Sequence, residues 1–166
     1  TFGTTTIQKL PYGSDVFVAK LGADGIWGWV SHISGTMYGS GYGAGIALDG
    51  TGGLYFSASL LPDSLSYNGT AVPLTGPGGL CVVKLDTSGA WQWIAESDAP
   101  GVNLLVCDPL GNVYVGGPWN PGGVGEIHIA GDTLEVGWNV DLFMAKVDAS
   151  GSWSWGKNFT SFGGTQ

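Results

Sequence analysis

Short apolar runs separated by glycine-containing turns recur along the whole chain. The runs VFVAKL (16–21), LCVVKL (80–85) and LFMAKV (142–147) each lead into a loop, GADG, DTSG or DASG, and each loop leads into a segment with Trp at alternate positions. Asp and Ser favour the start of a type I turn, and Gly supplies the positive φ that closes it. Each unit is therefore predicted to be a β-hairpin. Because no segment keeps a helical apolar period, we expect almost no helix.

Three of these hairpins align without a gap, at residues 15–29, 79–93 and 141–155, and we name them the first, second and third Trp hairpins. Their lysines are 64 and 62 residues apart, and the turn glycines and Trp pairs keep this register. A second unit, the GIALD-type hairpin, occurs at 45–59 and 103–117. Such spacing is the mark of a repeat architecture. The recurring residues are Lys20, Lys84 and Lys146; Gly25, Gly89 and Gly151; and Trp27, Trp29, Trp91, Trp93, Trp153 and Trp155.

The segments between the hairpins, LSYNGTAVPL (65–74) and GEIHIAGDTLEV (125–136), alternate in polarity and predict one further strand or a small hairpin each. Near four strands per repeat is compatible with a propeller blade, a solenoid coil or a sandwich. VFVAKL and LCVVKL are apolar on both faces, so both faces of their sheets should be covered, whereas a sandwich sheet would alternate more cleanly. The pattern favours the propeller.

The pattern D-x-F-x-A-K-x-D-x-S-G-x-W-x-W, followed by a hairpin of the form GYG-x-x-I-A-x-D-x-x-G-x-x-Y, resembles the bacterial β-propeller repeat called SBBP. That repeat occurs in tandem in secreted and surface proteins and carries no common catalytic motif. The resemblance therefore implies a propeller-like fold, a bacterial source and an extracellular location. Two departures stand out: Gly22 replaces the loop Asp of the first copy, with Asp24 two places on, and Gly79 replaces Asp15 and Asp141.

The predicted fold is all-β, with tandem antiparallel hairpins forming roughly three propeller-like blades that are incomplete at both ends. Residues 1–7 (TFGTTTI) stand in the position of a linker strand without an upstream hairpin, and residues 158–166 (NFTSFGGTQ) stop where the next hairpin would begin. Bare sheet faces and edges invite association. Either the chain is a segment of a longer protein, or other copies complete its ends. We expect a single repeat domain over 1–166, with units at roughly 1–40, 41–99 and 100–166.

Charge excludes several classes of partner. Thirteen acidic residues against five lysines give a net charge of −8, so no basic patch is available for nucleic acid or for an anionic lipid surface. No apolar run approaches the ~18 residues that a membrane span needs. At 43% hydrophobic residues the chain can build a packed core.

The tryptophans are the most prominent candidate residues. Because the six repeated ones recur in every copy, we expect them to fill the same packing position in each repeat rather than to bind sugar rings. Trp119 and Trp138 fall outside the repeat and are the candidate glycan contacts.

Other chemistry is sparse. The loop acids Asp24, Asp86 and Asp148, with Asp49 and Asp108 in the other hairpin type, supply one carboxylate per loop, which suits turn formation better than the six to eight oxygens that calcium prefers.

His32 and His128 lack any metal-ligand spacing, and neither a nucleophile elbow nor a P-loop is present. We therefore predict no catalytic, cofactor or metal site and no enzyme activity. Cys81 and Cys107 are expected to be two buried thiols, with a disulfide between them as the alternative. Asn68 and Asn158 begin N-glycan acceptor tripeptides and are candidate glycosylation sites.

These observations predict a structural, self-assembling extracellular protein, a filament, sheath or surface-layer subunit. Its partners would be other copies of the chain, joined by β-strand pairing at the terminal segments or by stacking of blades. The alternative is an adhesin or lectin-like binding module, a fragment of a larger secreted β-propeller that holds glycans or a cell-surface protein.

Overall fold

The computed structural model describes residues 1–8, 15–35, 42–60, 65–72, 79–99, 102, 104–119, 125–136 and 141–159. In these ranges every regular element is an antiparallel β-strand and none is a helix, which confirms the all-β prediction. It follows that no described helix could cross a membrane. The strands are β1 (Val16–Leu21), β2 (Trp27–Gly35), β3 (Tyr42–Leu48), β4 (Leu54–Leu60), β5 (Leu65–Tyr67), β6 (Thr70–Val72), β7 (Gly79–Leu85), β8 (Trp91–Ser97), β9 (Leu104–Cys107), β10 (Val113–Trp119), β11 (Gly125–Ile129), β12 (Asp132–Val136), β13 (Asp141–Val147) and β14 (Trp153–Phe159).

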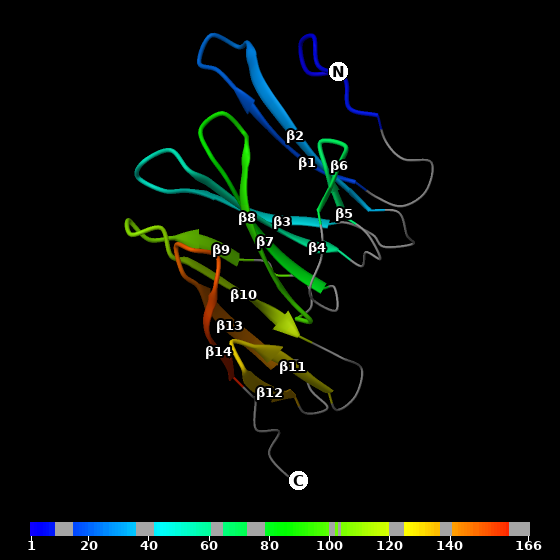
Figure 1. Ribbon diagram of the computed structural model, residues 1–166. Coiled ribbons are helices and arrows are strands. Elements are labelled where there is room, and N and C mark those ends of the chain that lie inside the picture. The colour runs from blue at the N-terminus through cyan, green and yellow to red at the C-terminus, as the bar shows by residue number, and fades with distance from the viewer. Residues whose placement is uncertain are drawn as a thin grey trace.

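Three four-stranded sheets follow one another as a stack from the N-terminus to the C-terminus (Figure 1). The first sheet has the order β1-β2-β5-β6, the central sheet β3-β4-β7-β8, and the third sheet β14-β13-β10-β9. The central and third sheets each combine one GIALD-type hairpin with one Trp hairpin. The first sheet has a Trp hairpin only, extended at β2 by the small hairpin β5–β6.

The turns have the predicted chemistry. The loop glycines Gly25, Gly89 and Gly151 have φ of 76°, 80° and 91°, where a side chain would be strained. Each Trp hairpin also shifts register just before its loop, as between Lys84 and Leu85. The two linker segments are small hairpins, β5–β6 and β11–β12, as the alternation predicts.

Two apolar layers hold the stack together, one on each face of the central sheet. Successive residues of β7 point to opposite faces, so Cys81 and Val83 pack toward the first sheet while Leu80 and Val82 pack toward the third. All four are buried. The central sheet thus meets the expectation drawn from LCVVKL, with both faces covered.

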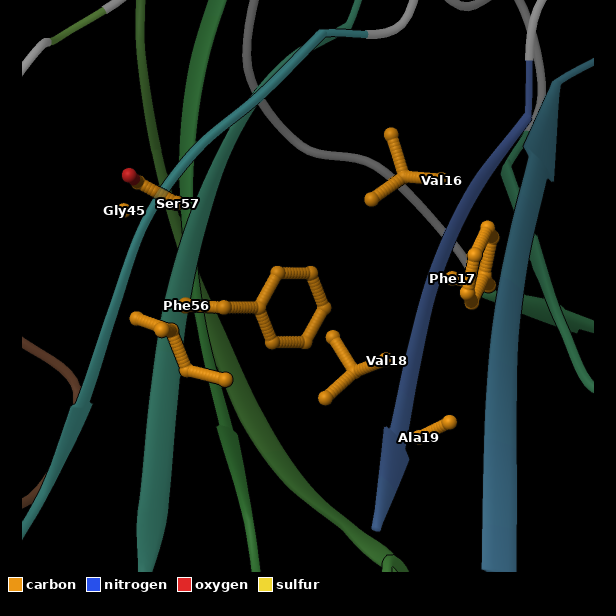
Figure 2. Close-up of a pocket in the computed structure, with 8 residues that line it drawn as sticks. Val16, Phe17, Val18, Ala19, Gly45, Phe56 and Ser57 are labelled. Atoms are coloured by element: carbon orange, nitrogen blue, oxygen red, sulfur yellow. The ribbon is translucent and has the colours of Figure 1, made fainter. Parts of the chain in front are cut away.

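The same expectation is wrong for VFVAKL in β1. Val16 and Val18 point toward Phe56 of the central sheet, but Phe17 lies on the other side of β1 (Figure 2) and is 56% exposed. Leu21 is also exposed. The apolar pattern of β1 predicts that the face carrying Phe17 is covered, but no described sheet of this chain covers it.

Candidate assembly interface

The outer face of the third sheet repeats a face that is buried in the central sheet, but no described sheet covers it. Leu142 and Met144 of β13 correspond through the repeat to Leu80 and Val82 of β7, which are fully buried. Leu142 is 54% exposed. It lines an apolar groove that we name the outer groove, formed by Leu104, Gly116, Gly117, Leu142, Phe143, Met144 and Phe159.

The outer face of the first sheet also leaves apolar side chains exposed, although the N-terminal residues cover part of it. Phe17 occupies the position of Phe143 in the third Trp hairpin, and Phe143 is 1% exposed because it packs against the central sheet. Phe2 is the one described residue with a ring contact to this outer face. Its ring centroid lies 5.1 Å from that of Phe17 and 5.0 Å from that of Trp27. The end faces of the stack are therefore apolar, and each matches one half of an internal layer.

The N-terminal turn has the form of the small hairpins. Phe2 pairs with Thr5 across a turn whose first position, Gly3, has φ of 59°. In β5–β6, Tyr67 pairs with Thr70 across a turn whose first position also has positive φ. Tyr67 then packs on Trp91 of the next sheet with ring centroids 4.9 Å apart, as Phe2 packs on Trp27. Residues 1–5 thus form a further copy of the linker turn, placed against the first sheet.

A Trp–Gly contact joins each pair of neighbouring sheets. The Trp29 ring lies over Gly89 so closely that a Cβ placed on Gly89 would be 2.6 Å from ring atom Cδ2. The Trp29 Nε1–H donates to the carbonyl oxygen of Thr87 in the same loop, at 3.1 Å. Trp93 repeats both features one sheet on, with 2.8 Å to a Cβ on Gly151 and a 3.2 Å hydrogen bond to the carbonyl oxygen of Ala149.

The remaining predicted tryptophans lie in less uniform settings. Trp153 Nε1–H donates to the carbonyl oxygen of Glu96 at 2.7 Å, which links the third sheet back to the central one. Trp155 has Tyr114 beside it at 6.3 Å between ring centroids. Trp138 lies outside the described residues, as does the side chain of Trp119. The glycan contacts proposed for these two stay a prediction.

The loop carboxylates act within their own turns. Asp86 accepts hydrogen bonds from the hydroxyl and N–H of Ser88, at 2.6 and 2.9 Å, and Asp148 does the same with Ser150. The serine hydroxyl bond is the main cause that lowers the pKa of each carboxyl. In the first loop, where Gly22 replaces this Asp, Asp24 instead accepts from the N–H of Ile26.

The histidines pair with aspartates rather than with each other. His32 Nε2 lies 3.1 Å from a carboxylate oxygen of Asp15, and His128 Nδ1 lies 2.8 Å from one of Asp98. The Asp98 carboxylate also accepts from the N–H of His128, which fixes β11 to the end of β8. Across the described ranges, no three His, Cys, Asp or Glu side chains are grouped so as to hold a metal ion.

The candidate glycosylation sites lie on or beside strands. Asn68 occupies the β5–β6 turn, where its side-chain oxygen accepts from the N–H of His32 at 2.9 Å. Asn158 on β14 donates from Nδ2 to the carbonyl oxygen of Glu135. Their modification stays a prediction.

Cys81 and Cys107 are both free thiols. The disulfide alternative is thus not formed: Cys81 belongs to the layer between the first and central sheets, and Cys107 packs against the layer on the other face of the central sheet. Cys107 is only half-buried, unlike the two buried thiols expected.

We expect Cys107 to react with a thiol reagent at pH 8 well before Cys81 in the folded chain. Burial raises the pKa of the Cys81 thiol to about 12, so both access and thiolate are lacking there. Mass spectrometry of labelled peptides measures the order. In a Cys107→Ser control, labelling should need denaturant, and fast labelling of the native control would contradict the burial of Cys81.

Several residues of the interface are not among those that the sequence singles out, above all Phe2, Phe17 and Leu142. For Phe17 and Leu142 the signal lies in the alignment of the copies: each end copy keeps an apolar residue at a position that is buried against a neighbouring sheet in the middle copy, as Cys81 and Leu80 are. Composition and motif searches do not use that relation.

The fold and this interface define a class: an all-β protein of stacked antiparallel sheets whose two end faces are apolar and open. No family model and no curated protein matches the chain.

Proposed function

We propose that the protein is a structural, self-assembling subunit of an extracellular filament, sheath or surface layer. Its three sheets act as propeller-like blades of the type seen in SBBP repeats, and the end blades stack on blades of other copies. The carrying observation is that positions buried in the central sheet, such as Leu80, are matched by exposed apolar residues in the end sheets, such as Leu142. The extracellular location rests on the sequence resemblance.

Stacking buries the apolar surface that the single chain leaves in water, and each Å² removed contributes about 25 cal/mol. The two end faces differ, because one belongs to a first sheet and the other to a third sheet. A contact between unlike faces is head-to-tail, and it extends without limit unless its rotation closes a ring. We propose the open case, in which the contact does not close a ring and the copies form an extended polymer.

The purified chain is expected to form ordered polymers without added ligand, visible by electron microscopy and sedimentation. Leu142→Glu should weaken association about 10-fold or more, because it places a charge in an apolar contact. The matched control is Leu110→Glu, since Leu110 is 80% exposed in a loop away from the outer groove. A wild-type chain that stays a monodisperse monomer at every concentration would overturn the proposed function.

One observation favours the alternative, a lectin-like binding module. A groove of mixed polar and apolar lining lies between residues 5–8 and strands β2 and β5, and its polar residues include Gln8, His32, Ser34 and Asn68. Such donors and acceptors suit the hydroxyl groups of a sugar. A monomeric chain that is retained on a glycan column would support this function instead.

A further inference from the structure

In the second and third Trp hairpins, the loop glycine is covered by a Trp ring of the preceding sheet, and we call such a loop a Trp seat. The loop of the first Trp hairpin has the same backbone, but no described Trp covers it. Its backbone repeats the hydrogen bonds of the two occupied seats: the N–H of Gly25 donates to the carbonyl oxygen of Gly22 at 3.0 Å, as that of Gly89 does to Asp86. Gly25 also has the same positive φ. Yet a Cβ on Gly25 would meet no described atom within 4 Å, whereas Gly89 is covered by Trp29.

Trp155 is the matching ring, since no described loop glycine lies beneath it as Gly89 lies beneath Trp29. It holds the position of Trp29 and Trp93 in the repeat. It also lies beside Tyr114, whose neighbours Val113 and Val115 face the central sheet, so Trp155 lies on the opposite face, toward the C-terminal end of the stack. Both counterparts donate Nε1–H to a loop carbonyl of the following sheet. In the described part of the chain, Trp155 Nε1 has no such acceptor. Among the described residues, the loop at Gly25 therefore lacks a Trp ring at one end of the stack, and the Trp155 ring lacks a loop at the other end.

We propose that Trp155 of one chain packs on Gly25 of a second chain and donates its Nε1–H to the carbonyl oxygen of Ala23. Ala23 is the repeat equivalent of Thr87 and Ala149, the acceptors in the two internal contacts. This inference rests on the proposed function, and it names the head-to-tail contact through which the copies join.

The rest of the two faces agrees with this register. Phe143 enters the layer against Leu80 and Val82 of the central sheet. In the proposed contact, Phe17 of the second chain takes that place and enters the outer groove beside Leu142. Both ends of the contact are thus preformed in the single chain, and continuity with the internal layers makes a second copy of this chain the occupant.

The test uses two variants that each block one end. Gly25→Asn keeps a residue that tolerates positive φ but puts a side chain where the Trp ring would lie. Its matched control is Gly131→Asn, at a turn glycine with φ of 82° and equally open space. Trp155→Ala removes the ring at the other end. Circular dichroism establishes that each variant is folded.

In sedimentation velocity, Gly25→Asn and Trp155→Ala should each associate at least about 30-fold more weakly than wild type, as for an interface aromatic anchor. Gly131→Asn should assemble normally. An equimolar mixture of the two blocked variants should form dimers and no larger species, because only one productive contact remains.

The outcomes separate this inference from the function on which it rests. If wild type forms polymers and Gly25→Asn or Trp155→Ala forms the same polymers, the proposed contact is wrong but the proposed self-assembly is still supported. A mixture of the blocked variants that stays monomeric also overturns the contact. A wild-type chain that never assembles overturns both.

Discussion

Replacing Trp91 and Trp93 together by alanine is expected to lower the free energy of unfolding by several kcal/mol, since one buried large aromatic contributes on the scale of about 3–5 kcal/mol. Trp93 covers Gly151 of the third sheet, and Trp91 packs on Tyr67 of the first. The double variant therefore loses contacts in both apolar layers. Urea unfolding followed by circular dichroism, at a protein concentration where the chain is monomeric, measures the loss.

Trp155→Ala is the matched comparison for this double variant. Trp155 has the same place in the repeat as Trp93, but the one aromatic ring beside it among the described residues is that of Tyr114, in its own sheet. Its loss should cost the single chain much less. If the Trp91 and Trp93 double variant keeps wild-type stability and loses only ligand binding, the packing role is refuted.

Deleting residues 1–7 is expected to give a folded chain that does not polymerise. These residues form a linker-type turn, and in β5–β6 such a turn extends the edge of the preceding sheet at β2. The corresponding edge in a neighbouring chain is β14, which borders the third sheet. Without the turn, that edge keeps unpaired backbone groups, and each one that is buried costs of order 1–3 kcal/mol.

Sedimentation velocity and circular dichroism measure assembly and folding of the truncated chain. Phe2→Ala is the companion variant, because it keeps the backbone of the turn and removes only the ring that contacts Phe17 and Trp27. If strand pairing joins the chains, Phe2→Ala should still assemble in part, because it keeps the backbone of the turn, whereas the truncated chain should not assemble. If the truncated chain assembles as the intact one does, end pairing is wrong.

The hairpins could be predicted from the sequence because their causes are local. A turn such as Asp86 to Gly89 contains the carboxylate and the glycine that shape it, and the strands beside it alternate visibly. The sheet that a small hairpin joins is harder to predict from the sequence. The β5–β6 hairpin lies inside the second repeat unit but joins the first sheet, a pairing that depends on the edge left open beside β2.

The candidate interface was predictable only in part. VFVAKL and LCVVKL have nearly the same pattern, yet Cys81 is buried and Phe17, at the equivalent position, is exposed. A strand pattern records that a face is suited to a neighbour, and it does not record whether that neighbour belongs to the same chain. The proposed contact between Trp155 and Gly25 could not be predicted from the sequence, because it follows from the Trp29–Gly89 and Trp93–Gly151 contacts, which are seen only in three dimensions.

The central sheet, covered on both faces, also sets how folding and association depend on each other. In a stack where each sheet contacts only its neighbours, stability is a sum of sheet terms and interface terms. In the proposed polymer, both end sheets gain a second neighbour, which among the described sheets of the single chain only the central sheet has. Association therefore stabilises the folded form by mass action, and the melting temperature of the wild-type chain should rise with its concentration. On this proposal we expect the subunit to be least stable when it is alone and most stable within the polymer.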